Sequence, residues 1–268
     1  MRVCYSGAAG GIGRATVRRL LECGHEVLAL DVDAAGLEAL PEAAEIHSVD
    51  VTDADRVAAI LEGAGIDAVV AGAGWYELAA LEDLPADSLA RHLGTNVVGT
   101  HTVVRASLPQ LRARQGRIVI LGSVLGRVAL PYHGGYAAAK HALVGYADTL
   151  RREVGPRGVD VSLVEPGPVR TGFNERAADA LADRSESAYV DAYRPFLDRP
   201  SQPAATGVEP VADAIVRAVE ADRPRSRYRV SRRARWLPWL QTALPDRLVD
   251  RLVRSGIPGG LLSRLVDR

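Results

Sequence analysis

Cysteine and long apolar runs are scarce in this chain of 268 residues. The two cysteines, Cys4 and Cys23, show no metal-ligand spacing and are too few for a disulfide framework, which favours a reducing, cytoplasmic setting. No apolar run is long enough to span a bilayer, and the apolar opening is too short for a signal peptide. Internal repeats and metal-ligand clusters are also lacking. We therefore expect a cytoplasmic protein that needs neither disulfides nor a structural metal.

Net charge is absent as well, since 33 basic side chains balance 33 acidic ones. The balance is uneven, because residues 223–268 hold twelve arginines against three aspartates, together with Trp236 and Trp239. A basic, Trp-bearing amphipathic tail can lie weakly on an anionic membrane surface. The favoured alternative is that its arginines meet the acidic body of the same or a neighbouring subunit. No nucleic-acid binding is expected, because no reading motif accompanies the charge.

Apolar, strand-like runs alternate with helical stretches along most of the chain. The runs comprise residues 1–5, 27–31, 68–71, 117–121 and 159–164. This alternation indicates βαβ units and predicts an α/β fold, a doubly wound parallel sheet with helices on both faces. The length fits one domain, residues 1–230, followed by a basic amphipathic tail, residues 231–268.

A glycine-rich turn follows the first strand directly. Gly7, Gly11, Ile12 and Gly13 stand between that strand and an amphipathic helix that runs from Arg14 to a glycine stop. This order brings backbone N–H groups and a helix N-terminus to a pyrophosphate. The spacing differs from the G-x-G-x-x-G fingerprint, so a plain tight turn is the alternative; its place after the first strand favours nucleotide binding.

A second pattern carries acid/base chemistry. Tyr136 and Lys140 are one helical turn apart, and Ser123 ends the apolar run upstream of them. A phenol with a pKa near 10 is a poor proton carrier at neutral pH, but an ammonium about 4 Å away lowers that pKa by up to roughly three units. The Tyr-x-x-x-Lys pair alone is a weak signal. It gains weight only from the rest of the chain.

Together these residues resemble the short-chain dehydrogenase/reductase family. Further matches follow in the family's order along nearly the whole chain: Asp50-Val51 closing a third strand, Ala71-Gly72-Ala73-Gly74 after the fourth, Asn96 in Thr-Asn-Val-Val-Gly, and Pro166-Gly-Pro-Val169-Arg-Thr171. The resemblance implies a Rossmann-type fold and a nicotinamide cofactor. The overall layout is similar to that of hydroxysteroid and retinol dehydrogenase-like members.

The resemblance also implies a role for each matching residue. Tyr136 is the general acid/base, Ser123 binds the reacting oxygen, Lys140 binds the nicotinamide ribose, and Asn96 holds a water that joins Lys140 to solvent. Structural readings stay open for two of them: Asn96 as a helix-bending amide and Ser123 as a turn residue. The expected cofactor-binding residues are Gly7, Gly11, Ile12, Gly13, Asp31, Asp50, Val51, Gly72, Tyr136, Lys140, Pro166, Val169 and Thr171.

Asp31 decides which cofactor we expect. It ends the second strand about twenty residues after the glycine turn, where a carboxylate accepts hydrogen bonds from ribose hydroxyls and repels a 2′-phosphate. The family's phosphate-binding basic positions hold Gly10 and Val32. NAD is therefore expected, with NADP less favoured, although Asp31 can also simply begin a turn or cap a helix.

The motif at Ala71-Gly72 departs from the family pattern, which has two asparagines there. Losing both amides should weaken local hydrogen bonding by about 1 kcal/mol per bond. The backbone that faces the cofactor is not removed. Stability is therefore in more doubt than function.

Substrate identity is less legible. Residues 172–206 correspond to the family's specificity loop, and Ser123, Tyr132, Tyr136 and Phe173 are the expected substrate contacts. The lining is roomy and largely apolar, which suits a hydrophobic secondary alcohol or its ketone. An acidic substrate would need Arg127, Arg170 or Arg176. His133 can touch substrate or simply hold its loop.

The sequence leaves two alternatives to this enzyme function open. A catalytically idle NAD-binding sensor has no need of Ser123, Tyr136, Lys140 and Asn96 together, and a membrane-surface dehydrogenase acting on lipid-like substrates would use the basic tail.

The helices expected at residues 98–114 and 136–154 carry more apolar residues than one sheet-facing stripe requires. We therefore expect a homodimer or homotetramer that pairs through them.

Overall fold

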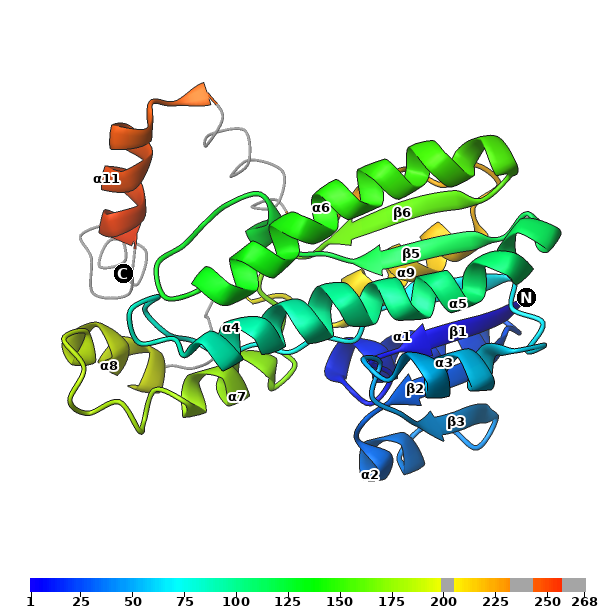
Figure 1. Cartoon of the computed structure of the whole chain (residues 1–268), viewed down its shortest axis with the longest axis horizontal. Helices are drawn as coiled ribbons and strands as arrows, with labels where there is room; N and C mark the ends of the chain where they lie inside the picture. The colour runs from blue at the N-terminus through cyan, green and yellow to red at the C-terminus, as the bar shows by residue number, and fades with distance from the viewer. Residues whose placement is uncertain (199–204, 232–242, 257–268) are drawn as a thin grey trace.

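The fold is built on one parallel sheet of seven strands. The computed structural model describes residues 1–198, 205–231 and 243–256, and Figure 1 shows the sheet at its centre. The strands are β1 (Arg2–Ser6), β2 (Glu26–Asp31), β3 (Ala44–Ser48), β4 (Ala68–Ala71), β5 (Arg117–Leu121), β6 (Asp160–Glu165) and β7 (Arg227–Arg229). Their order is β3-β2-β1-β4-β5-β6-β7, and every pair is parallel. The predicted doubly wound α/β fold is confirmed.

Short apolar runs produce this sheet because both of its faces are covered. All four residues of β4 are buried, as are the middle residues of β1, β2 and β5. Helices α1 (Gly11–Glu22) and α9 (Glu209–Glu220) cover one face, and α3 (Ala54–Leu61), α5 (Gly99–Arg114) and α6 (Gly134–Val154) cover the other. In Figure 1 the second group lies in front of the sheet. Burial on both faces explains why the strands read as continuous rather than alternating apolar runs.

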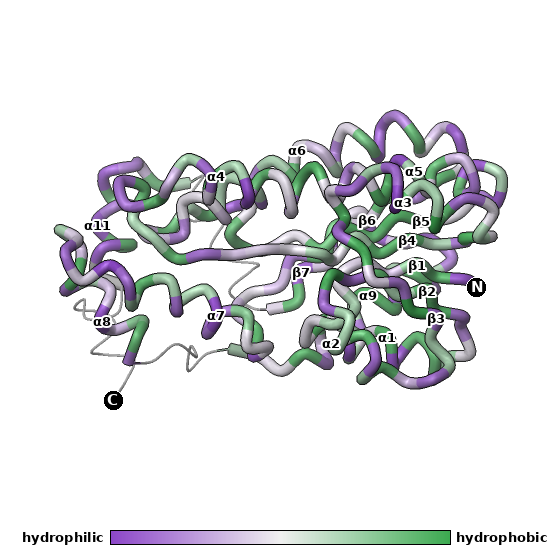
Figure 2. The backbone as a smooth tube through the Cα atoms, turned by 60° about the horizontal axis from the view of Figure 1, so that its bottom comes forward, coloured by the Kyte–Doolittle hydropathy of each residue, from purple (hydrophilic) through white to green (hydrophobic). Residues whose placement is uncertain are grey.

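Several elements leave the sheet at the carboxyl ends of its strands. They are α2 (Ala34–Glu38), α4 (Ala86–Leu93), the π-helical turn η1 (Gly94–Val98), the short turn η2 (Val124–Gly126), α7 (Phe173–Asp179) and α8 (Val190–Asp198), whereas η3 (Gly155–Arg157) leads from α6 into the amino end of β6. Figure 2 shows α4, α7 and α8 together at one end of the molecule, with the strands at the other. The loops that join these elements bring the predicted site residues together.

One sequence prediction about these elements was wrong. Asp50-Val51 do not close the third strand, because β3 ends at Ser48; Asp50 instead accepts hydrogen bonds from the backbone and hydroxyl of Thr52 in the following turn. On α5 and α6, the apolar residues that face the core of their own subunit are Val103, Val104, Leu111, Leu143, Ala147 and Leu150. Pairing of the remaining apolar residues with another subunit stays a prediction.

The tail is described only in part. Helix α11 (Asp246–Gly256) is amphipathic and exposes Leu248 and Leu252, whereas Trp236 and Trp239 lie outside the described residues. Within the described ranges no helix is both long and apolar enough to cross a membrane. The domain boundary at residue 230 and the cytoplasmic location remain predictions.

Candidate active site

The glycine turn is shaped by close backbone approach. Gly7 has a φ of 82°, and a Cβ on it would stand 2.7 Å from the backbone of Gly72 at the end of β4. A Cβ on Gly13 would stand 2.2 Å from the Gly7 carbonyl oxygen, and one on Gly11 would stand 2.8 Å from the side chain of Thr171. Only glycine fits at these positions. The turn therefore meets both the end of β4 and the Pro-Gly motif, which are far apart in sequence.

The missing asparagines at Ala71-Gly72 are partly replaced by other groups. The hydroxyl of Ser6 accepts a hydrogen bond from the Gly72 N–H at 3.3 Å. A Cβ at Gly72 would stand 3.1 Å from the phenol oxygen of Tyr5, a fully buried side chain at the middle of β1. Ser6 thus supplies one of the bonds that the family's amides would provide, whereas the buried Tyr5 hydroxyl has no hydrogen-bond partner among the described residues, so part of the expected local weakening remains.

Asp31 lies where the sequence predicted, at the end of β2 and facing the glycine turn. Its carboxylate accepts the Ala9 N–H at 2.9 Å and the Asp33 N–H at 3.0 Å. The helix that follows is capped by Asp33, which accepts from Gly36 N–H, so Asp31 begins a turn but does not cap a helix. The neighbouring Val32 is 71% exposed. A carboxylate therefore stands beside the predicted pyrophosphate turn with no basic side chain next to it in sequence.

Ser123, Tyr136 and Lys140 meet at the ends of β5 and α6. Ser123 hydrogen-bonds with Tyr136, and its Oγ also accepts the Leu125 N–H at 3.1 Å. Lys140 Nζ lies 5.4 Å from the centre of the Tyr136 ring and donates to the Leu121 carbonyl oxygen at 2.8 Å. Lys140 is the only lysine in the chain; the other 32 of its 33 Lys and Arg residues are arginines. A single amine is thus retained at the one position where the predicted chemistry needs it.

The protonation of this group differs from the sequence prediction. We expected the Lys140 ammonium to lower the pKa of Tyr136, but burial raises that pKa above its ordinary value and the Ser123 hydrogen bond opposes the rise. Burial also lowers the pKa of Lys140 to about 8. The reason is geometric, because the amine points to the Leu121 carbonyl and lies over the phenol ring, not at its oxygen.

Asn96 sits in the π-helical turn between α4 and α5. Its Nδ2 donates to the carbonyl oxygens of Trp75 and His92, both at 2.8 Å, which ties the turn to the loop after β4. Its Oδ1 is buried without a hydrogen-bond partner among the described residues. A buried acceptor of this kind commonly binds an ordered water. Both earlier readings of Asn96, a structural amide and a water ligand, are compatible with this geometry.

The Pro-Gly motif holds the Ser123 loop from the other side. The Pro166 carbonyl oxygen accepts the Val124 N–H at 2.8 Å, Val169 forms a bridge with Thr206, and Thr171 Oγ1 accepts the Phe173 N–H at 3.2 Å. These contacts place Pro166, Val169 and Thr171 along one rim of the site. Asp50 and Val51 have no contact with that rim in the hydrogen bonds and ring contacts of the described residues.

Aromatic side chains form a wall over Tyr136. The ring of Tyr76 lies 4.6 Å from that of Tyr136 and 5.5 Å from that of Phe173. Farther out, the ring of Tyr132 packs against Tyr193 at 5.6 Å. His133 is buried behind this wall, where its Nδ1 bonds with the Pro131 carbonyl oxygen at 2.8 Å and holds its own loop. The expected apolar lining is present.

Sequence reasoning missed two charged groups near the site. Glu165 is buried at the end of β6 and pairs with Arg127 at 3.0 Å and with Arg229 at 3.3 Å. Asp83 bonds to residues of the specificity loop. Both are acidic residues in ordinary-looking segments, and only their distant partners distinguish them. The pairing of Arg127 also removes it as a partner for an acidic substrate.

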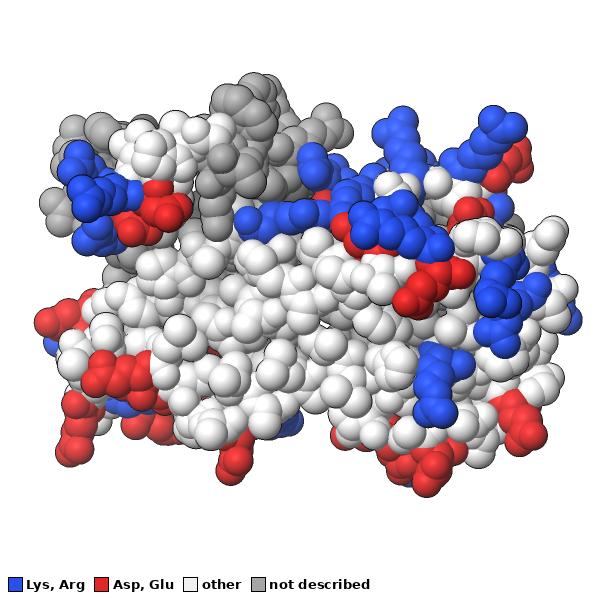
Figure 3. All heavy atoms as spheres, turned by 45° about the horizontal axis from the view of Figure 1, so that its top comes forward, with Lys and Arg blue, Asp and Glu red and all other residues white. Residues whose placement is uncertain are grey.

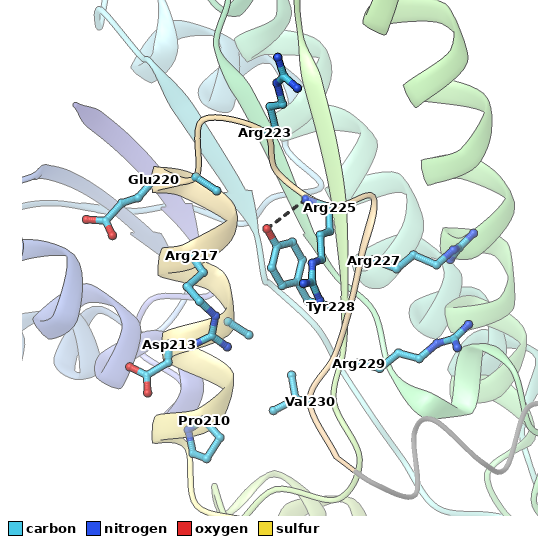
Figure 4. Close-up of a pocket in the computed structure, with 12 residues that line it drawn as sticks. Pro210, Asp213, Arg217, Glu220, Arg223, Arg225, Arg227, Tyr228, Arg229 and Val230 are labelled. Carbon is cyan, nitrogen blue, oxygen red and sulfur yellow. Dashed lines mark hydrogen bonds between the residues drawn. The ribbon is translucent and has the colours of Figure 1, made fainter.

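A separate groove of about 1110 Å³ lies between α9 and β7 and contains none of the predicted site residues. Figure 4 shows Tyr228 and Val230 pointing into it from β7, while Arg227 and Arg229 point to the other side. Those two arginines pair with Glu165, and Arg227 also pairs with Asp148. These two arginines of the basic segment therefore pair with acidic side chains of their own subunit, and the behaviour of the tail beyond them stays a prediction.

Known proteins are similar to this chain in sequence and in fold. The short chain dehydrogenase family model matches residues 1–182. A probable short-chain type dehydrogenase/reductase, VdlC of Helicobacter pylori, is 32% identical over 95% of this chain and 97% of its own. Human 17-beta-hydroxysteroid dehydrogenase type 1 is 36% identical over 77% of this chain and 65% of its own.

Solved structures agree with the sequence relatives. A short chain dehydrogenase from Burkholderia cenocepacia, solved with NADP, has a TM-score of 0.77 at 25% identity and covers 94% of this chain and 96% of its own. Other solved dehydrogenases of this kind hold NAD. Among the described residues, no group of three or more His, Cys, Asp or Glu side chains could hold a metal ion. The chain belongs to the short-chain dehydrogenase family and is an oxidoreductase.

Proposed function

We propose that this enzyme uses NAD to interconvert a hydrophobic secondary alcohol and its ketone, with Tyr136 as the general acid/base. The observation that carries the proposal is the meeting of Ser123, Tyr136 and Lys140 beneath an aromatic wall. A phenol and its hydrogen-bonding partners are an acid/base apparatus, and the wall selects an apolar neighbour for it.

The protein groups would divide the work as follows. In reduction, the Tyr136 hydroxyl gives its proton to the substrate oxygen, and its raised pKa keeps that proton in place through neutral pH. Ser123 orients the same oxygen, where charge develops. Lys140 would return a proton to Tyr136 through a water that the buried Oδ1 of Asn96 holds. Oxidation reverses these steps.

The glycine turn fits a dinucleotide. The close approaches at Gly7, Gly11 and Gly13 leave backbone N–H groups at the start of α1 accessible to a pyrophosphate. Bound there, the nicotinamide would exchange a hydride with the substrate carbon. Asp31 beside the turn favours NAD, because ribose hydroxyls can donate to its carboxylate and a 2′-phosphate would be repelled.

The side chains that line the site favour an apolar substrate. Tyr76, Tyr132 and Phe173 offer aromatic surface, and Arg127 is engaged by the buried Glu165. The names of relatives add support, since they include a 17-beta-hydroxysteroid dehydrogenase and a retinol dehydrogenase. A bulky apolar alcohol or ketone therefore suits this site better than an acidic one.

Tyr136→Phe tests the proposal. It should lower kcat by at least roughly a hundredfold, the range in which general acid/base groups contribute. Cofactor affinity should stay near that of the wild type, because little binding surface is lost. Turnover would be followed by nicotinamide absorbance with a panel of lipophilic secondary alcohols and ketones. Tyr76→Phe, which removes the hydroxyl of the adjacent ring, is the matched control. A retained rate in Tyr136→Phe at saturating cofactor would refute the mechanism.

A further inference from the structure

We propose that Asp83 is a positioning residue that latches the specificity loop over Tyr136 and thereby sets how tightly the site holds a bulky apolar substrate. The substrate part of this inference rests on the proposed function. Asp83 lies in the loop after β4, about fifty residues before Tyr136, and touches none of the predicted reacting groups. Its influence has to pass through the residues that it binds.

The side chain of Asp83 holds two points of the loop at once. Its Oδ2 accepts hydrogen bonds from the hydroxyls of Ser187 and Tyr193, on either side of the start of α8. Its backbone carbonyl oxygen accepts a third bond from Arg184 Nη1 at 2.9 Å. One residue therefore gathers three positions of the specificity loop, which is an arrangement that a chance surface contact does not produce.

Neighbouring residues strengthen the same connection. Arg184 also pairs with Glu77, and both side chains are largely buried, with 15% and 11% of their surfaces exposed. The Tyr189 hydroxyl donates to Glu82 at 2.9 Å. The segment 77–83 and the loop thus face each other through a row of polar bonds. The Tyr189 ring also packs against Tyr132, but Asp83 differs from Glu82 because its partner Tyr193 is almost fully buried in the aromatic wall.

Tyr193 carries the connection into the site. It is 1% exposed, its hydroxyl oxygen accepts the Ala80 N–H at 3.0 Å, and its ring lies against that of Tyr132. Tyr132 has a φ of 70°, in the left-handed region that a bulky side chain rarely adopts. Such a conformation persists only where its surroundings hold it in place. The packing of Tyr193 and the bond from Ala79 N–H to the Tyr132 carbonyl oxygen supply that hold, four residues before Tyr136.

The charge of Asp83 suits this task. Both hydroxyl partners donate to it, and they lower its pKa, so the carboxylate is ionised at neutral pH and can accept both bonds together. Both bonds end on the same carboxylate oxygen, and a neutral amide there loses the charge assistance that makes such bonds roughly twice as strong. Asp83→Asn therefore weakens the latch with almost no change in volume.

The variants Asp83→Asn and Tyr193→Phe test the latch, with Asp183→Asn as the control. Asp183 is exposed and lines a surface hollow together with Asp83. With 4-phenyl-2-butanone, both latch variants should raise KM about tenfold and change kcat far less. With acetone, which is too small to reach the wall, KM should stay near its wild-type value. Because the two residues share one bond, the double variant should cost little more than either single one.

A second measurement does not depend on turnover. Backbone amide hydrogen exchange in residues 172–198 should become faster in Asp83→Asn and Tyr193→Phe but not in Asp183→Asn, while the amides of β1 and β4 keep their protection. Unchanged exchange in the loop would overturn the latch, and so would equal KM increases for both ketones. If the wild type reduces no ketone at all, the proposed function fails, and the exchange experiment still decides whether Asp83 holds the loop.

Discussion

At the scale of single residues, Lys140 is the most unusual group in the molecule. A buried ammonium without an acidic partner costs free energy, and arginine, the basic residue used everywhere else in this chain, could not give up its proton there. Because Lys140 is the only lysine, its titration can be followed without assignment. Lysine labelled with ¹³C at Cε should give one NMR signal that titrates near pH 8. A midpoint above 10 would show that the amine is not desolvated as described.

The same burial predicts that Lys140→Met stabilises the inactive protein. The fall of the Lys140 pKa from 10.5 to about 8 corresponds to roughly 3 kcal/mol of destabilisation, which Lys140→Met removes. The variant also leaves the Leu121 carbonyl without its donor, which costs about 1 kcal/mol. The penalty is full below pH 8, where folded and unfolded chains are both protonated. It disappears as pH rises towards 10.5, because the folded state loses its proton first. Urea unfolding at pH 7 and pH 10 should show the gain only at pH 7.

Asp31 carries the prediction about cofactor choice. Replacing it by alanine removes repulsion of a 2′-phosphate, and Val32→Arg adds a cation at a position that is already 71% exposed. The double variant should move the ratio of kcat/KM for NAD over NADP towards NADP by on the order of tenfold to a hundredfold. Asp33→Ala removes the cap of α2 and should leave that ratio alone. A wild type that already prefers NADP at low cofactor concentration would contradict the argument.

At the scale of elements, the sequence correctly predicted those features that depend on a local residue pattern. The buried strands, the glycine turn and the helix with Tyr136 and Lys140 depend on residues close together in the chain, so their spacing was informative. The end of β3 was misplaced by three residues, because Asp50 bonds to its own turn and not to the sheet. Boundaries of this kind depend on bonds that no periodicity records.

Contacts between distant elements were the part that could not be predicted. Ser6 partly compensates for the missing asparagines only because β1 lies beside β4, which places its hydroxyl against Gly72. The pKa of Tyr136 was predicted in the wrong direction for the same reason, since burial by Tyr76 and Phe173 is a property of the assembled site. Such effects follow from the packing of loops, and the sequence alone does not place loops.

At the scale of the whole molecule, charge distinguishes possible contact surfaces. Figure 3 shows basic side chains gathered on the upper right of one face, with acidic ones along the lower rim. The edge strand β7 carries Arg227 and Arg229, and Arg223 and Arg225 precede it (Figure 4). Two copies joined edge to edge through β7 would bring these arginines together, and charged edge strands resist such pairing. We therefore expect assembly through a different surface.

The outer face of α6 suits that assembly. Ala138, Ala142, Gly145 and Thr149 are exposed at helical spacing, and a Cβ on Gly145 would meet no atom within 4 Å. Val98, just before α5 on the same side of the sheet, is 52% exposed. A strip of small residues lets two helices approach closely around a two-fold axis. We expect a dimer that holds the helix bearing Tyr136 and Lys140 from behind.

Ala142→Glu should break this dimer, because it puts a bulky carboxylate beside its own symmetry mate. Light scattering at micromolar protein should give twice 28.5 kDa for the wild type and a mass near 28.5 kDa for the variant. Arg225→Glu, at the edge of the sheet, should leave the dimer intact. Loss of activity in the monomeric variant would follow if the second subunit supports α6. A wild-type monomer with full activity would instead mean that the exposed strip on α6 serves no assembly, and a dimer lost only in Arg225→Glu would place the interface at β7.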